Sequence, residues 1–321
     1  MNRRAFLKVA GLGVGLALLG SSGQAQTMDG LAATMAQAAQ RFLSTLTTSE
    51  RTQTSFAFPS AERTRWHWTT PAAVPRNGLA LRDMSNASRV AALALLRSSL
   101  SFAGYEQAVQ IIALQLELGQ DDGLYYVSIF GTPGTASWGW RFEGHHLSKH
   151  FTVAEQRVTM TPFFTGAWPT QPASAARAMP REEDAARELV RSMSADGRKT
   201  TIFQADSLTQ HVTQNAVRVR ALPTVGITIS SLSAAQQNLM LEIIAAYLGT
   251  LPELVAAPML EVVKREFAAS RFGWAGSLEP LRSHYYRWQS ASHLLEFDNS
   301  RNGGTHIHSV WRDFAGDFGG L

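Results

Sequence analysis

The sequence predicts an α+β protein in which helices and antiparallel strands come in separate blocks. Helical periodicity dominates residues 28–118 and again 181–267, whereas apolar and polar residues alternate over 124–160 and 284–312. Such blocks favour α+β, because a parallel α/β sheet would alternate one strand with one helix throughout. With 45% hydrophobic and 17% charged residues, the composition excludes a disordered chain.

The first helical block is expected to contain three helices. Apolar residues recur near helical spacing over 28–47. Between Asn86 and Gly119 two further helical patterns are separated at Gly104, and Gly119 is a typical residue just past a helix C-terminus.

The first strand block is predicted as a β-meander. Its strands are expected over 124–130, 137–142 and 150–160, with a turn at Thr132-Pro133-Gly134. The Pro/Ala/Thr-rich stretch at 166–180 that follows is the best linker candidate, although a loop fits it equally well.

The second half repeats this order of helices followed by strands. Helices are predicted over 181–193, 233–247 and 251–267, and Ser233 and Gln236 have the spacing of a capping box. Strands are then predicted over 284–289, 293–298 and 305–312, the last two joined as a hairpin by the turn at 299–304.

The first 25 residues have the organisation of an export signal. Arg3, Arg4 and Lys8 precede a short apolar stretch from Val9 to Gly20, and a small-residue cleavage site ends at Ala25. The arginine pair followed by Phe-Leu-Lys resembles a twin-arginine signal, although an ordinary secretion signal also fits. We therefore expect the twin-arginine export machinery as a partner, a periplasmic or secreted protein, and no stable membrane insertion after cleavage.

Charge and cysteine content narrow the possible chemistry. The formal net charge is +4, and the three positive charges of the first 25 residues have no acid beside them. A cleaved chain of about +1 gives no reason to expect a nucleic acid partner. The absence of cysteine excludes disulfides, thiolate metal sites and a cysteine nucleophile. Any metal site must therefore use histidine and carboxylate ligands.

Histidines are concentrated near the end of the chain, in the segment Thr305–Asp313. Because side chains alternate along a strand, His306, His308 and Arg312 are expected on one face. A His-x-His pair on a strand places two imidazoles at a spacing that can bind one metal ion.

A second polar segment lies in the predicted meander, from Trp138 to His146. Arg141, Glu143 and His145 are expected on one face of its strand. His145 or His146 would be the third metal ligand, only one of the two if the strand stays regular there. Glu143 would then be a ligand, a hydrogen-bond partner of a ligand, or a general base.

These residues lead to the hypothesis of an exported metalloenzyme. Its metal ligands would be His145 or His146 together with His306 and His308, and the metal one divalent Zn, Fe or Cu ion. Glu143 would serve as base, and Arg141, Arg312 or Tyr286 would orient a small polar or anionic substrate. Metal-activated hydrolysis and oxidation are both open. The phosphate-binding and dinucleotide-binding glycine motifs are missing from the sequence after the signal, so no nucleotide cofactor is expected.

Three other interpretations fit the same residues. The polar strand faces can simply be solvent-exposed faces of the sheet. The histidines can belong to a non-catalytic periplasmic metal- or ligand-binding protein. They can also serve a metal-free acid/base hydrolase.

Several long motifs resemble the DUF3500 family of bacterial proteins of unknown function, many of which carry twin-arginine signals. The resemblance is carried by Trp-Gly-Trp-Arg-Phe-Glu-Gly-His-His-Leu-Ser (138–148), Thr161–Ala167, Tyr285-Tyr286-Arg287, Glu296–Asn299 and His306–Asp313. It covers the chain from about residue 30 to the C-terminus. The resemblance implies that residues 26–321 are a single domain, and it implies no established activity.

Overall fold

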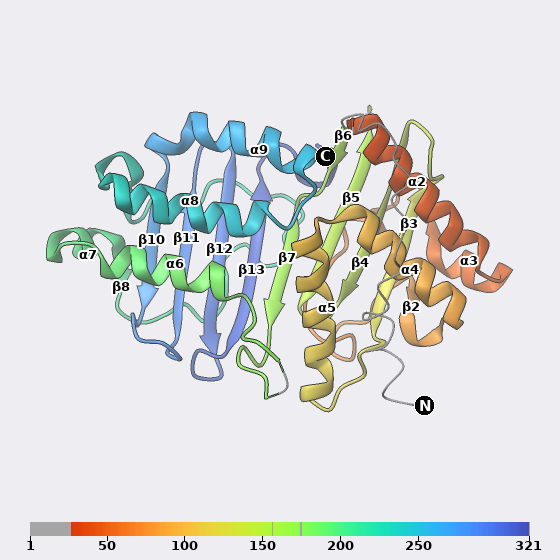
Figure 1. Ribbon diagram of the computed structural model, residues 1–321, viewed down its shortest axis with the longest axis horizontal. Coiled ribbons are helices and arrows are strands. Elements are labelled where there is room, and N and C mark those ends of the chain that lie inside the picture. The colour runs from red at the N-terminus through yellow and green to blue at the C-terminus, as the bar shows by residue number, and fades with distance from the viewer. Residues whose placement is uncertain (1–26, 156, 174, 321) are drawn as a thin grey trace, which may run out of the picture.

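One large sheet dominates the computed structural model, which describes residues 27–155, 157–173 and 175–320. The predicted export signal lies outside these residues. The sheet has 13 strands, with the order β1-β3-β4-β5-β7-β13-β12-β11-β10-β8, and β2, β6 and β9 pair at its sides with β3, β5 and β10. Most neighbours are antiparallel, which confirms the predicted α+β class. The main helices all cover one face of the sheet (Figure 1).

The strands of the sheet are short to medium in length. They are β1 (Ser55–Phe56), β2 (Leu79–Ala80), β3 (Tyr125–Gly131), β4 (Ser137–Gly144), β5 (Leu147–Ala154), β6 (Arg157–Thr159), β7 (Phe163–Ala167), β8 (Ile202–Gln204), β9 (Ile227–Thr228), β10 (Arg271–Gly276), β11 (His284–Gln289), β12 (His293–Arg301) and β13 (His306–Asp313). The strand expected over 150–160 was wrong at both ends, because β5 begins at Leu147 and ends at Ala154. Strands β7 and β10 and the short strands β2, β8 and β9 were not predicted.

Eight α-helices occur among the described residues. They are α2 (Met28–Ser44), α3 (Thr48–Thr54), α4 (Asn86–Ser99), α5 (Phe102–Glu117), α6 (Pro180–Arg191), α7 (Ala195–Thr201), α8 (Ala234–Leu248) and α9 (Glu253–Glu266). The predicted capping box is confirmed, since Ser233 Oγ accepts from Gln236 N and Gln236 Oε1 accepts from Ser233 N.

The predicted break at Gly104 was wrong. The chain is interrupted earlier, where Ser101 caps α5 by accepting from the Gly104 amide at 3.0 Å. Gly104 is instead required by packing, because a Cβ there would collide with the carbonyl oxygen of Thr250. The glycine marks a close approach between α5 and the end of α8, which sequence spacing does not distinguish from a helix end.

Strand β7 joins the two predicted strand blocks into one sheet. It pairs antiparallel with β5 on one side and with β13 on the other, with Gly166 opposite His308. Figure 1 shows this junction at the centre of the sheet, between the two groups of helices. The pairing brings the two histidine segments, more than 150 residues apart in the chain, to the two sides of β7.

The face of the sheet away from the helices is polar but buried. Loops from 57–78 and 205–226 lie against it. Trp68 O accepts from His146 N at 2.8 Å, and Asn215 links the two loops by donating to Trp66 O at 3.1 Å. His306 and His308 are therefore only 8% and 2% exposed, so the interpretation of a solvent-exposed sheet face was wrong for them.

Lys149 is a buried cation on the helix-covered face and provides a test of pH-dependent stability. It donates to Thr165 Oγ1 at 2.5 Å, and burial lowers its pKa from 10.5 to about 7, with a smaller opposing effect from Glu182. The unfolded chain holds this proton more tightly than the folded protein does. Burial of the charged ammonium therefore lowers the free energy of unfolding by its full amount below pH 7, and this destabilisation fades as the pH rises toward 10.5.

We expect Lys149→Met to increase the free energy of unfolding by about 1–4 kcal/mol at pH 7, because an apolar side chain replaces a buried charge. The gain should shrink at pH 10. Urea unfolding at both pH values measures this, and a variant less stable than the parent at pH 7 would contradict it.

Candidate metal centre

His306 and His308 lie at the start of β13 and point to the same side of the sheet. The pairing of β12 with β13 shifts between Asp298 and Arg301, and Asn299 fills the irregularity by accepting from His306 N at 2.8 Å. Asn302 Oδ1 lies 2.8 Å from His306 Nδ1. An amide oxygen only accepts, so Nδ1 carries the proton and the Nε2 lone pair is free for a metal.

His145 and His146 form the tight turn between β4 and β5. His146 has φ of 64°, a left-handed conformation that is uncommon for residues other than glycine. Its amide donates to Trp68 O and its carbonyl accepts from Gly166 N, both at 2.8 Å, so neighbours on two sides hold this conformation. The turn breaks strand alternation, and the two adjacent rings stack with centroids 3.8 Å apart.

The ring nitrogens of three histidines converge on one point. His146 Nε2 lies 2.7 Å from His306 Nε2 and 3.3 Å from His308 Nε2. Two nitrogens bound to one tetrahedral zinc ion at the usual bond length are about 3.3 Å apart. A ring nitrogen of His145 also lies within 4.8 Å of those of His146 and His306. The structure thus brings His145, His146 and His306 together as one possible ligand group, and it places His308 Nε2 at the zinc spacing from His146 Nε2.

Burial keeps these imidazoles neutral, which is the form that binds metals. It lowers the pKa of His145 to about 4, with Arg76 adding to the shift, and that of His306 to about 3. The pKa values of His146 and His308 are lowered well below the ordinary value, again chiefly by burial. His145 Nδ1 lies 2.8 Å from Gln115 Oε1, which leaves its Nε2 unprotonated.

A cavity of about 300 Å³ opens beside His145. His145 and His306 are 7% and 8% exposed, whereas His146 is 1% exposed, so the cluster is reached from the side of His145 and His306. The cavity is lined by Thr70, Pro71, Ala72, Gln115, Gln120, Asp121, Leu124, Tyr125 and His145. This is space for water or a small ligand next to His145, one of the four predicted ligands.

Arg141 and Glu143 lie on the same buried face but are engaged in structural contacts. Glu143 Oε1 is 2.7 Å from Arg76 Nε, and Oε2 accepts from Ser148 Oγ at 2.8 Å. Arg141 pairs with Glu62 at 2.7 Å and donates to two carbonyls of the loop at 57–78. Both side chains therefore fasten that loop to the sheet.

Arg312 and Tyr286 are also away from the histidine nitrogens. Arg312 Nε pairs with Asp317 Oδ2 at 2.6 Å, and its Nη2 holds the second loop by donating to Ala216 O. Tyr286 lies on the helix-covered face, where it donates to Glu182 O and contacts Tyr247 Oη. The alternation of side chains along β11 explains this position. Tyr286 pairs with Phe297 and faces the helices, whereas Tyr285 and Arg287 lie on the polar face.

Two residues that the sequence interpretation did not assign lie beside His308. His211, from the loop at 205–226, and Asp298, from β12, each place a ligand atom within 4.8 Å of one from His308. In the sequence Asp298 stood out only because it lies next to other polar residues. Its pairing with His308 across β12 and β13 places it beside that histidine. His211 carried no sequence signal, because it is isolated in an irregular loop.

Gly166 makes room for the His146 ring. A Cβ at this position would lie 3.1 Å from His146 Cδ2 and 2.5 Å from Ile307 O.

We expect Gly166→Ala to weaken metal binding by about 10–100-fold, as for other changes that misplace a ligand. Metal titration of the variant measures the loss. Gly139→Ala is the matched control, since its Cβ would lie 2.6 Å from Phe151 O in the same sheet, away from the histidines. Equal affinities of the two variants would contradict the expectation.

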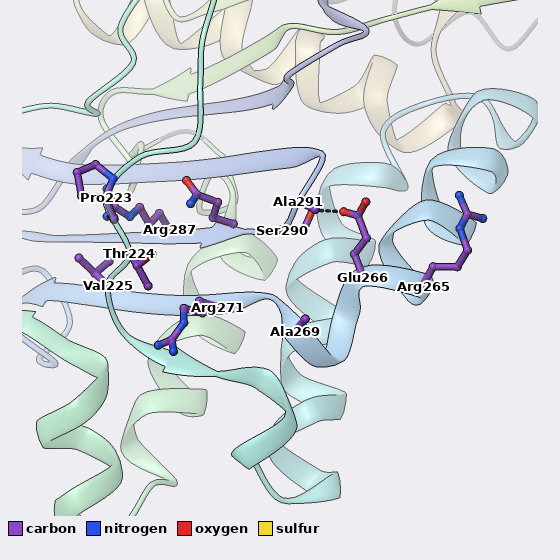
Figure 2. A pocket seen from close by; sticks show the side chains of 11 residues that line it. Pro223, Thr224, Val225, Arg265, Glu266, Ala269, Arg271, Arg287, Ser290 and Ala291 are labelled. Carbon is purple, nitrogen blue, oxygen red and sulfur yellow. Dashed lines mark hydrogen bonds between the residues drawn. The ribbon is translucent and has the colours of Figure 1, made fainter.

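A larger cavity, of about 490 Å³, lies at the other end of the sheet. Figure 2 shows it between the segment at 223–225 and the ends of α9, β10 and β11. Its Arg287 donates to Pro223 O of that segment, Arg271 donates to the neighbouring Gly226 O, and Glu266 accepts from Ser290 Oγ at 2.5 Å. No histidine lines it, so size alone does not locate the candidate site.

Comparison with known proteins gives one result. A family model described as "Protein of unknown function (DUF3500)" matches residues 29–320. Neither the curated proteins nor the solved structures gave a match. No helix among the described residues is both long enough and apolar enough to cross a membrane. Because the match covers nearly the whole chain, as the motifs around the four histidines indicated, the protein belongs to the DUF3500 family.

Proposed function

We propose that the protein is a metalloenzyme that activates water at the histidine cluster to hydrolyse a small polar substrate. The convergence of the Nε2 atoms of His146, His306 and His308 carries this proposal. A site made of histidines without a carboxylate would leave most of the charge of a divalent ion uncompensated, and such an ion would lower the pKa of a bound water to about 7.

The cavity beside His145 supports a catalytic role rather than a role in metal storage. His145 both contributes to the cluster and lines the cavity of about 300 Å³, so a ligand there would lie beside the ion. Polar groups of Gln115, Gln120 and Asp121 offer donors and acceptors for a small polar molecule. A site used only to hold metal would need no such space.

Metal content and chelation test the proposal. We expect protein purified after natural export to contain bound metal, and to hydrolyse at least one member of a panel of small esters, amides and phosphoesters. Treatment with a strong chelator should abolish turnover, and the metal found in the native protein should restore it. Absence of metal in the purified protein together with activity in chelator would support metal-free acid/base catalysis instead.

Two alternatives use the same ligands. Bound iron or copper with turnover only in the presence of an oxidant would indicate oxidation. Stoichiometric metal binding without turnover of any substrate would indicate a metal-binding protein.

The proposed location is outside the bacterial cytoplasm, with metal acquired before export. The arginine pair at Arg3 and Arg4 supports this. Replacing both by lysine should retain the uncleaved protein in the cytoplasm, and cell fractionation measures the shift. Unchanged export of the variant would favour the ordinary secretion route.

A further inference from the structure

A second group of possible ligands lies directly behind the first. His211, Asp298 and His308 each offer a ligand atom, and these atoms lie within 4.8 Å of one another. Asp298 and His308 are paired directly across β12 and β13, and Asp298 Oδ2 is 3.8 Å from His308 Nδ1. The rings of His211 and His308 meet edge to face, with centroids 6.0 Å apart.

The polar atoms of this group are buried without a hydrogen bond of good geometry to any described residue. These atoms are both ring nitrogens of His211, Oδ2 of Asp298 and Nδ1 of His308. His211 and Asp298 are 0% exposed and His308 is 2% exposed. Native structures rarely leave several buried polar atoms unsatisfied at one point, and a bound cation would satisfy them together.

His308 belongs to both groups through its two different ring nitrogens. Its Nε2 lies 3.3 Å from His146 Nε2, in the first cluster, and its Nδ1 faces Asp298. One imidazole therefore stands between the two ligand sets. An imidazole can bind a metal at each nitrogen once its single N–H proton is released to solvent.

We propose that the protein binds a second divalent ion between His211, Asp298 and Nδ1 of His308, and that the His308 imidazolate bridges this ion to the one in the first cluster. The inference rests on the proposed function, since it takes the first site as its neighbour. Nitrogen ligands with one carboxylate suit Zn²⁺ or Cu²⁺. The residues of the second site are buried, whereas the first site adjoins the cavity. The second ion would therefore hold His308 in position, and the first ion would contact the substrate.

Copper loading tests the bridge without any substitution. The full chain, freed of metal and titrated with Cu²⁺, should bind two ions. Its low-temperature EPR signal should fall well below two spins per chain, because an imidazolate bridge couples the two unpaired electrons. Adding one equivalent of Zn²⁺ with one of Cu²⁺ should give an uncoupled copper signal in the mixed form.

Variants separate this inference from the proposed function. His211→Ala and Asp298→Asn should each reduce binding to one ion per chain with a full one-spin signal, and circular dichroism checks that both variants fold. If the parent binds one ion, and both variants keep it unchanged, the second site is refuted while the first stands. If the parent binds no metal, the proposed function itself fails.

Discussion

His146→Asn should abolish tight metal binding. His146 Nε2 is the atom common to the two shortest distances of the cluster, 2.7 Å to His306 and 3.3 Å to His308. Asparagine tolerates the left-handed backbone that His146 adopts, and its shorter side chain ends before the Nε2 position. We expect affinity to fall by more than the 10–100-fold typical of losing a ligand's hydrogen-bond partner, as measured by competition with a chromophoric chelator.

The matched control is His284→Asn on the helix-covered face. Like His146, His284 is buried, and its ring stacks on Trp274. Its Nδ1 bonds to Arg282 O, and it lies outside both candidate ligand groups. This variant should lose stability while retaining metal affinity. Equal metal affinity in the two variants would remove His146 from the ligand set.

Glu143→Gln is expected to cost about 3–5 kcal/mol of unfolding free energy, because it leaves buried positive charge unpaired. Glu143 Oε1 is 2.7 Å from Arg76 Nε, and these side chains are 1% and 2% exposed. Oε2 is 3.7 Å from Arg141 Nε and accepts from His67 N at 3.1 Å. Neutralising the carboxylate weakens its contact with Arg141 within β4 and its contacts with Arg76 and His67 of the loop at 57–78.

Urea unfolding measures this cost, with Glu261→Gln as control. Glu261 pairs with Lys264 at 2.7 Å, but the two side chains are 61% and 56% exposed. The control should therefore change stability by less than about 1 kcal/mol. A Glu143→Gln variant of unchanged stability that loses turnover would assign Glu143 the role of general base.

The sequence predicted most elements whose hydrophobic pattern is long. The helices α2, α6 and α8 and the strands β3, β11 and β12 begin within about two residues of their predicted starts, because core-facing positions repeat over several turns or pleats. The five residues of β7 were missed, since five residues carry too few periods and all five are buried on both faces.

The pattern of the sequence also determined that His306 and His308 share a face, because strand alternation is a local property of the backbone. It could not determine which strands become neighbours. That was decided by β7, whose pairing with β5 and β13 sets Gly166 beside both His146 and His308. Nor could alternation place both His145 and His146 in one cluster, because the left-handed turn at His146 is held by Trp68 and Gly166, which are distant in the chain.

The sequence by itself therefore determined the ligand chemistry: without cysteine, a metal site must use histidine and carboxylate. Only the tertiary structure decided which of these residues meet. In the structure Tyr286 lies on the opposite face of the sheet from the histidines, and Glu143 forms an ion pair with Arg76. His211 and Asp298 provide further possible metal ligands. The physical reason is that coordination requires a few ångströms between atoms, and such proximity arises from strand pairing and loop packing between segments far apart in the chain.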